Sequence, residues 1–304
     1  MKSIIRKIIE FFLPYYLIKS GKINKVIKNA TEGNIILSVF FHNPSKELFE
    51  SIVKWFINHD FQFISADQLY EIGTGKKTFP SKAVIFTVDD GWKENKENLV
   101  AVANKYDIPV SIFINTDPIE NGKGYWVSYL KYSQEKLGTP HSVGSIKKLP
   151  DSHRKDIISQ LSASIELPRE GMTIDELRSI NKGNISLGAH TLSHPFLVNC
   201  SDEDSKNEIL GSKEKLDNWL GTNVDTFAYP FGSFGEREIE FVKSAGYKMA
   251  FSTVADYITK DNISSLYKLP RFEVIEHATF RENLCRMTGV WDETMKFMKK
   301  NKLN

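Results

Sequence analysis

The stretch "AVIFTVDDGW", residues 83–92, runs from an apolar segment straight into two adjacent carboxylates, a glycine and a tryptophan. β-Branched and aromatic residues fill its first part, which predicts a strand that ends at Asp89 and Asp90. Similar short runs recur along the chain between longer amphipathic segments, and this alternation predicts βα units around a parallel sheet. The predicted strands cover residues 34–41, 61–65, 83–88, 110–115, 185–189, 226–230 and 249–254.

Seven or eight strands are more than a small doubly wound sheet needs. We therefore expect an α/β fold, a single-domain distorted parallel (β/α)7–8 barrel, with an open Rossmann-like sheet as the alternative. The barrel is predicted to span residues 34–290, with a helical insertion at residues 116–183 over one face. Residues 1–33 are predicted to form an N-terminal amphipathic helical extension, and residues 291–304 a C-terminal helical tail.

Composition excludes some classes of function. The 304 residues include 40 Lys and Arg against 38 Asp and Glu, so no broad positive field would attract nucleic acid. Cys200 and Cys285 lack CxxC spacing and are expected to be buried thiols. Glu10 and Pro14 interrupt the apolar N-terminal run, and no cleavage site follows it. We therefore expect a cytoplasmic protein, in which residues 1–20 either make weak membrane-surface contact or pack on the core.

Unusual chemistry follows three of the predicted strands. Asp89 and Asp90 end one strand, His190 and His194 follow another, and "FAYPFG" (227–232) ends a third. Each motif alone is also consistent with an ordinary turn. In a parallel barrel, however, these strand ends share one mouth, where two histidines and one aspartate can form a metal triad. A neighbouring carboxylate that does not touch the metal can act as a base, so the sequence predicts metal-assisted hydrolysis.

Together, "TVDDG" (87–91), "HTLSHP" (190–195) and "AYPFG" (228–232) resemble the first three motifs of carbohydrate esterase family 4, the polysaccharide deacetylases. The resemblance implies a distorted parallel barrel that removes N-acetyl groups from an N-acetylated oligo- or polysaccharide and releases acetate. It also implies a divalent metal ion, with zinc our first choice. The site residues that it implies are Asp89 as general base and Asp90, His190 and His194 as metal ligands.

Two departures from the family pattern concern the remaining catalytic groups. Ala228 occupies the position of an arginine that normally accompanies the base, and Arg271 in "LPRF" is our candidate replacement. For the general acid we choose His42, which ends the first predicted strand. This placement resembles the poly-N-acetylglucosamine deacetylase branch, whose motif order is circularly permuted. His277 in "IEH" is the alternative acid, and the plain alternative for His42 is a strand-end histidine bonded to a backbone carbonyl.

Three aromatic residues complete the predicted site. Trp92, Tyr229 and Phe231 are expected to contact the substrate or the oxyanion. Trp92 could stack on a sugar or cover the rim of the barrel, and the backbone N–H of Phe231 matches the family's oxyanion donor. Two other functions stay open: a catalytically inactive sugar-binding barrel, and a magnesium-dependent sugar-nucleotide or phosphoryl transferase. The second has no Gly-rich phosphate loop to support it.

Overall fold

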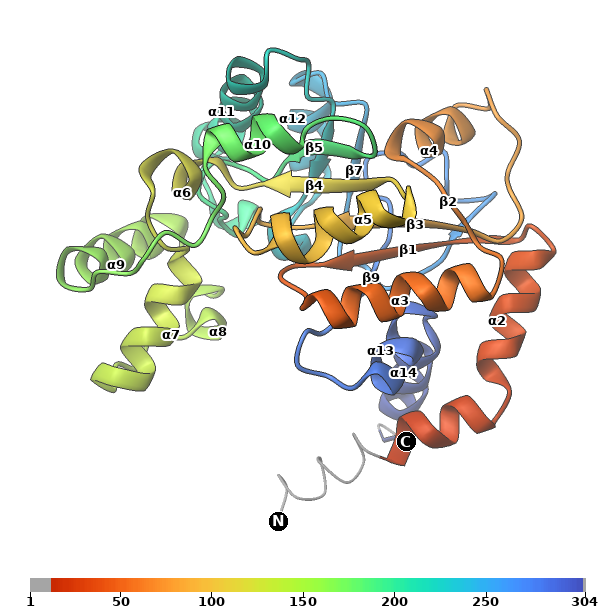
Figure 1. Cartoon of the computed structure of the whole chain (residues 1–304). Helices are drawn as coiled ribbons and strands as arrows, with labels where there is room; N and C mark the ends of the chain where they lie inside the picture. The colour runs from red at the N-terminus through yellow and green to blue at the C-terminus, as the bar shows by residue number, and fades with distance from the viewer. Residues whose placement is uncertain (1–11, 303–304) are drawn as a thin grey trace.

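The computed structural model describes residues 12–302. A mainly parallel sheet lies at the centre of the fold. Its strands run in the order β7-β6-β5-β4-β3-β1-β8, with β2 beside β3 and β9 beside β1 (Figure 1). All pairings are parallel except that of β8 with β1. The strands are β1 (Ile35–Phe41), β2 (Gln62–Phe63), β3 (Ala83–Val88), β4 (Val110–Ile114), β5 (Ile185–Ala189), β6 (Thr226–Ala228), β7 (Met249–Phe251), β8 (Ile258–Thr259) and β9 (Phe272–Glu273).

The sheet curls because one segment, residues 269–274, bonds to both of its distant strands. Leu269 forms a parallel bridge with Phe251 of β7. Three residues later, Phe272 pairs with Val39 of β1. The two ends of the parallel sheet are thereby joined into a distorted barrel rather than left open as a Rossmann-like sheet.

Alternation along the strands separates an inner from an outer core. In β3, Val84 and Phe86 belong to the large hydrophobic cluster beneath the helices, whereas Ala83 and Ile85 belong to the cluster inside the barrel. Successive side chains of a strand face opposite sides, so the same period carries residue 89 to the inner face. Both faces of these strands are apolar because both are buried, as is usual for parallel sheets.

Helices cover the outside of the sheet, and their starts have clear causes. The hydroxyl of Ser45 accepts the N–H of Leu48 at the start of α3, and Ser201 caps α11, as side-chain oxygens do for unpaired helix N–H groups. Besides the helical residues 12–19, the described helices outside 116–183 are α2 (Lys22–Thr31), α3 (Lys46–Asn58), α4 (Ala66–Gly73), the π-helical η1 (Lys96–Val100), α5 (Ala101–Tyr106), η2 (Leu197–Asn199), α11 (Asp202–Leu220), η3 (Pro230–Gly232), α12 (Glu236–Ser244), α13 (Phe280–Met287) and α14 (Val290–Lys302).

All seven predicted strands are present, and five of them are shorter than predicted. Predicted strand 61–65 keeps two residues, and predicted strand 226–230 stops before Pro230, because proline has no N–H for the ladder. The short strands β8 and β9 were not predicted from the sequence. Cys200 and Cys285 are buried and free, as expected.

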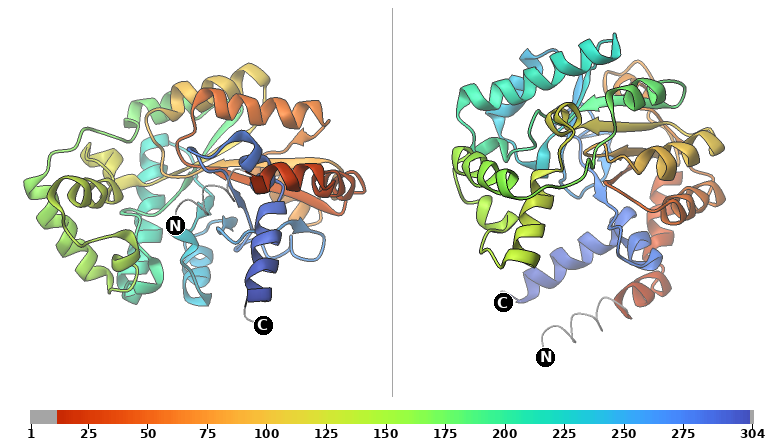
Figure 2. Two further views of the ribbon diagram at one scale, coloured as in Figure 1. Left: turned by 90° about the horizontal axis from the view of Figure 1, so that it is seen from below. Right: turned by 60° about the vertical axis from the view of Figure 1, so that its left-hand side comes forward.

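Residues 116–183 form helices beside the barrel mouth and, just before β5, one helix on the outside of the sheet (Figure 1). They are α6 (Thr116–Asn121), α7 (Trp126–Leu137), α8 (Val143–Ile146), α9 (Asp151–Ser164) and α10 (Ile174–Ile180). Helices α7 to α9 stand to one side of the sheet, where the arrowhead of β4 points (Figures 1 and 2). Trp126, Leu130 and Ile146 form a separate hydrophobic cluster with Phe196, which follows β5. Helices α7 to α9 therefore pack on the loop after β5, whereas Leu177 and Ile180 of α10 belong to the large outer cluster.

The N-terminal prediction is described only in part. Residues 1–11, which carry most of the expected membrane contact, lie outside the described residues. Farther along, Ile23, Val26 and Ala30 of α2 are buried in the large cluster. Within residues 12–302, no helix combines the length and apolarity that a membrane span requires.

Candidate active site

The turn after β3 positions the two aspartates differently. Asp89 continues the inner face of the strand and is 2% exposed. At Asp90 the chain enters the left-handed region, with φ of 75°, and Gly91 follows with φ of 80°. A Cβ on Gly91 would lie 2.8 Å from Cδ1 of Ile114, so glycine is required there for space as well as for conformation. The turn thus sends adjacent carboxylates in different directions.

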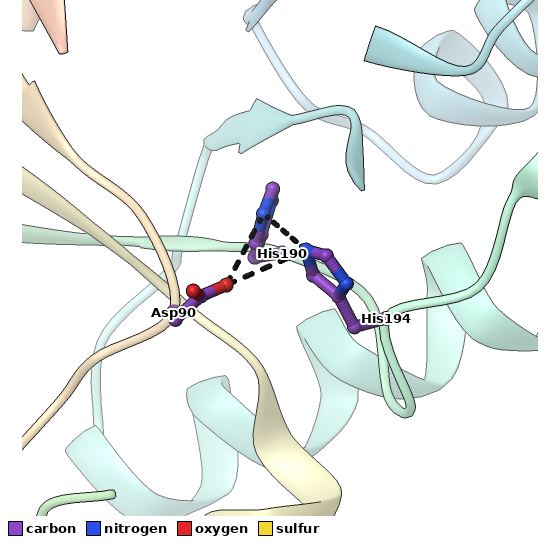
Figure 3. Close-up of side chains that lie close together, drawn as sticks. All are labelled: Asp90, His190 and His194. Atoms are coloured by element: carbon purple, nitrogen blue, oxygen red, sulfur yellow. Dashed lines mark hydrogen bonds and ion pairs between the residues drawn. The ribbon is translucent and has the colours of Figure 1, made fainter. Parts of the chain in front are cut away.

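Three side chains from two strand ends converge on one point (Figure 3). Oδ1 of Asp90 lies 3.4 Å from Nε2 of His194 and 3.7 Å from Nε2 of His190. The two Nε2 atoms are 3.1 Å apart. His190 and His194 are 1% and 9% exposed. This trio is the group predicted to bind a metal.

The donor atoms of the trio carry lone pairs that face one another. Nδ1 of His190 is 2.7 Å from the carbonyl oxygen of Ala228 and must donate to it, so Nε2 of the neutral ring is left as an acceptor. Burial lowers the pKa of His194 to about 3, which keeps its imidazole neutral. Oδ1 of Asp90 is buried without a hydrogen-bond partner. A cation at this point would satisfy all three atoms, so the residues fit a metal ion.

Aromatic side chains hold the loops of the trio from outside. The indole N–H of Trp92 donates to Oδ2 of Asp90 at 3.1 Å, and the hydroxyl of Tyr125 donates to the Asp90 carbonyl at 2.8 Å. The indole N–H of Trp126 donates to the His194 carbonyl at 2.9 Å. Such outer contacts fix the orientation of metal ligands. Trp92, expected at the rim or on a sugar, lines the cavity and also orients a carboxylate.

Arg271 forms a buried bidentate ion pair with Asp89. Its two terminal nitrogens each lie 2.8 Å from a carboxylate oxygen, and the guanidinium is fully buried. Its third nitrogen donates to the carbonyl of Ser252 at 2.9 Å. Desolvation raises the pKa of Asp89, but the charge and hydrogen bonds of Arg271, together with the charges of His190 and His42, outweigh it, and the pKa falls to about 2. Asp89 is therefore ionised at neutral pH, and its nearest approach to Nε2 of His190 is 4.0 Å.

His42 and His277 differ in access to the site. His42 follows β1, lines the cavity and has a side chain that is 34% exposed. Desolvation lowers the pKa of His42, but nearby carboxylates, including those of Asp90, Asp89 and Glu276, together raise it above the ordinary value. Nδ1 of His42 lies 3.9 Å from Oε1 of Glu276. The exposed His277 is not among the described residues that line the cavity.

The third motif supplies backbone more than side chains. Tyr229 is fully buried: its hydroxyl donates to the carbonyl of Tyr267 and its N–H to the carbonyl of Phe251. Both polar groups of Tyr229 are therefore already bonded within the protein, and the expected contact with substrate is not supported. Phe231 lines the cavity, adopts φ of 55°, and has its ring centroid 4.5 Å from that of His194. Its amide thus lies in the turn beside the metal trio.

These residues surround a cavity of about 570 Å³. Asp89, Asp90 and His42 lie on the strand-end side, and Tyr125 and Trp126 on the side of the 116–183 helices. A space of this size is typical of small-ligand pockets and is lined mostly by apolar surface with a few polar groups. The trio, Asp89 and His42 therefore face one cavity of small-ligand size.

Sequence reasoning missed several residues of the site. Asn115 directly follows β4 at the same edge as the three motifs, and its place at a strand end was a usable signal. Tyr125 and Trp126 lie in the helical segment, where apolar periodicity gives no indication that an aromatic residue faces a cavity. The carboxylate of Glu276 accepts the backbone N–H groups of His42 and Asn43. The sequence could not predict this contact, because 234 residues separate Glu276 from His42.

Comparisons with known proteins find a matching family profile and several relatives. A family profile described as polysaccharide deacetylase matches residues 76–250. The YxkH protein of Bacillus subtilis is 22% identical over 231 residues, which are 76% of this chain and 65% of that protein. The poly-beta-1,6-N-acetyl-D-glucosamine N-deacetylase of Staphylococcus aureus is 24% identical over 250 residues, 79% of this chain and 73% of the relative.

Solved structures share the fold. The Streptococcus pyogenes deacetylase PplD in complex with acetate has a TM-score of 0.62 and 17% identity, over 83% of this chain and 98% of that one. IcaB from Ammonifex degensii has a TM-score of 0.62 and 15% identity, over 84% of this chain and 97% of that one. These likenesses confirm the predicted fold class, a distorted parallel α/β barrel.

Proposed function

The chain belongs to the polysaccharide deacetylase family, and we propose that it uses zinc, held by Asp90, His190 and His194, to remove N-acetyl groups from a glycan. Family membership confirms the expected class, a metal-dependent hydrolase that cleaves a non-peptide amide bond in a carbohydrate. The substrate proposed is a polymer or oligomer that contains N-acetylhexosamine. The S. aureus relative, named for poly-beta-1,6-N-acetyl-D-glucosamine, makes a poly-N-acetylglucosamine the first candidate.

One observation carries the proposal: three metal-type donors converge beside a carboxylate that is already paired with another group. Asp90, His190 and His194 offer ligand atoms within 4.8 Å of one another. Asp89 is instead held by Arg271 through two bonds. A site that only bound a sugar would gain nothing from a buried, ionised carboxylate next to a metal trio.

The donor set favours zinc over magnesium. Two imidazoles and one carboxylate suit zinc, whereas magnesium prefers oxygen ligands in an octahedron. Donor atoms bound to a tetrahedral zinc lie about 3.3 Å apart, given bonds of about 2.0–2.1 Å. The separations among the three donor atoms are 3.1, 3.4 and 3.7 Å. The ligand atoms are thus already spaced for such an ion.

The chain's own residues supply the proton transfers. When bound, the zinc would polarise the acetyl carbonyl and make a water more acidic. Asp89, ionised at neutral pH, accepts the proton of the attacking water. The backbone N–H of Phe231 donates to the oxyanion, and protonated His42 donates to the departing nitrogen. The acetamide becomes acetate and an amine.

The rival functions make different predictions about metal and turnover. A magnesium-dependent transferase would retain activity in magnesium without zinc, and it finds no support in the two imidazoles. An inactive sugar-binding barrel would bind the oligosaccharide without releasing acetate. Nothing in the site favours either rival, because the base, the metal donors and the candidate acid face one cavity.

Acetate release tests the proposal directly. Protein freed of metal, and then reloaded with zinc or with magnesium, is incubated with poly-N-acetylglucosamine and chitin oligomers. We expect release with zinc, and loss of about 10²–10⁴ in kcat in Asp89→Asn, with zinc binding retained. No acetate from any N-acetylated oligomer would refute the activity, and near-normal turnover by Asp89→Asn would refute the role of its carboxylate.

A further inference from the structure

The side chain of Asn115 lies in the active-site cavity with its hydrogen-bonding capacity unused. Asn115 is 1% exposed, and neither its Oδ1 nor its Nδ2 has a hydrogen-bond partner. Among the described residues it is the buried asparagine with both amide atoms unpaired. Buried polar groups are nearly always bonded in native proteins, so an amide left with both atoms unpaired needs an explanation.

The register of the sheet puts Asn115 next to a metal-type imidazole. Ile114 pairs with Ala189 in the β4–β5 ladder, so the next residues, Asn115 and His190, stand opposite each other on neighbouring strands. The N–H of His190 donates to the carbonyl of Ile114 at 2.9 Å, which extends that ladder. Neighbouring strands lie about 4.8 Å apart, so the two residues are in immediate proximity.

Alternation along β4 fixes the side to which Asn115 points. Phe113 belongs to the cluster inside the barrel, whereas Ile112 and Ile114 belong to the outer cluster. Asn115 is two residues after Phe113 and therefore shares its inner face. It also lines the cavity with Asp89 and His190. The amide thus occupies the floor of the barrel mouth, on the strand between those two residues.

A second buried asparagine shows what a structural role looks like. Asn283, at 0% exposure in α13, donates through Nδ2 to the carbonyl of Ile275 and accepts the N–H of Ile275 through Oδ1, both at 2.9 Å. Its amide stabilises the fold by pairing backbone groups. Asn115 pairs none. In the same cavity Oδ1 of Asp90 is also unpaired, and it is one of the three atoms proposed above to hold the zinc.

Resting on the proposed function, we propose that the Asn115 amide is a further substrate-binding group, whose Nδ2 donates to the oxygen atoms of the reacting acetyl group and of acetate. An amide N–H₂ suits this task because it stays uncharged at every working pH and donates without competing for the metal. Because the amide makes no bond within the protein, donating to a ligand would break none, and the unpaired state costs stability. Such uncompensated polar groups are typical of functional sites.

The test compares Asn115→Leu with the matched control Asn283→Leu, since leucine keeps the shape and removes the polarity. Four quantities are measured: Tm of the zinc-free protein, Kd for zinc, Kd for acetate with zinc present, and kcat and KM for the oligomer. Asn115→Leu is expected to have a Tm equal to or above that of the wild type, because no bond is lost. Asn283→Leu should lose at least about 4 °C, because it leaves backbone groups unpaired.

For Asn115→Leu we expect zinc affinity within about threefold of the wild type, with acetate binding and kcat/KM each reduced about tenfold to a hundredfold. A Tm lowered as far as in Asn283→Leu would overturn the inference by giving the amide a structural role. So would a large loss of zinc affinity, or unchanged acetate binding. If the wild type released no acetate at all, the proposed function would fail, while Tm and acetate affinity would still decide the role of Asn115.

Discussion

The two walls of the cavity are built from different kinds of residue. The strand-end wall carries the groups proposed to exchange protons or bind a cation, such as Asp89, Asp90 and His190, and nearly every one is held by a bond from a distant strand or loop. The wall formed by residues 116–183 is mainly apolar and aromatic, and among its described lining residues Lys147 is the charged one.

This difference suggests that the strand-end wall carries out the reaction and that the helical wall selects the substrate. Charged groups must be held rigidly, because the reaction depends on distances of a few tenths of an ångström, and barrel strands provide that rigidity. An apolar wall of aromatic rings suits the faces of a sugar and gives shape rather than proton transfer. Changes on the strand-end wall should therefore remove turnover, and changes on the helical wall should mostly tune affinity.

The largest effect is expected from His194→Ala. The variant removes one of three donors, so zinc binding should be lost and acetate release should fall below detection. Metal content after dialysis and acetate assays measure both effects. The exposed His153 on α9 offers a matched control, because His153→Ala touches neither wall. A His194→Ala protein that retained stoichiometric zinc and turnover would show that the trio is no metal centre.

His42→Ala should lose about 10²–10⁴ in kcat with zinc still bound, because the departing nitrogen would lack its proton donor. His277→Ala is the comparison, since His277 is exposed and lies off the described cavity lining. Steady-state kinetics on a short N-acetylated oligomer separate the two. If His277→Ala were the impaired protein, the acid would have to be reassigned to the loop before α13.

Arg271→Met tests whether the ion pair in the strand-end wall also contributes to the stability of the fold. Removing the guanidinium leaves Asp89 buried and unpaired, so the free energy of unfolding at neutral pH should fall by about 3–5 kcal/mol. Because Arg271 depresses the pKa of Asp89 to about 2, its stabilisation is complete above the ordinary aspartate pKa and is lost as pH falls through 2. The deficit of the variant should therefore shrink in acid.

The exposed pair of Arg178 and Asp175 serves as the control, at 3.0 Å. Arg178→Met should change the free energy of unfolding by less than about 1 kcal/mol, since exposed pairs are screened by solvent. Urea melts of both variants across acidic and neutral pH measure the contrast. Equal, small effects in the two proteins would mean that the Asp89–Arg271 pair contributes nothing specific.

Trp126→Phe is the corresponding change on the helical wall. It keeps an aromatic ring but removes the indole donor to the His194 carbonyl. We expect zinc affinity to weaken about fivefold, as for the loss of about 1 kcal/mol of hydrogen bonding, with kcat nearly unchanged. Zinc titration and kinetics check this. A collapse of kcat comparable to that in His42→Ala would erase the distinction between the walls.

The same contrast explains what the sequence could predict. Period-two patterns predict the strands of the barrel. The rule that the ends of parallel strands share one mouth then predicts that residues 89, 90, 190 and 194 lie close together. Arg271 was predicted from the resemblance, as the replacement for the arginine whose position Ala228 occupies. The helical wall could not be predicted, because the packing of Tyr125 and Trp126 depends on tertiary contacts that no local sequence pattern records.

Glu276→Gln should have the smallest effect, confined to the pH profile. Glutamine keeps the oxygen that accepts the N–H groups of His42 and Asn43 but removes a negative charge that raises the pKa of His42. An acid with a raised pKa stays protonated to higher pH, so the variant should lose kcat at a lower pH than the wild type, by a fraction of a unit. The exposed Glu240 provides the control, Glu240→Gln, whose profile should match the wild type. An alkaline limb that stayed in place, or moved upward, would show that His42 does not set it, and the strand-end wall would then need another proton donor.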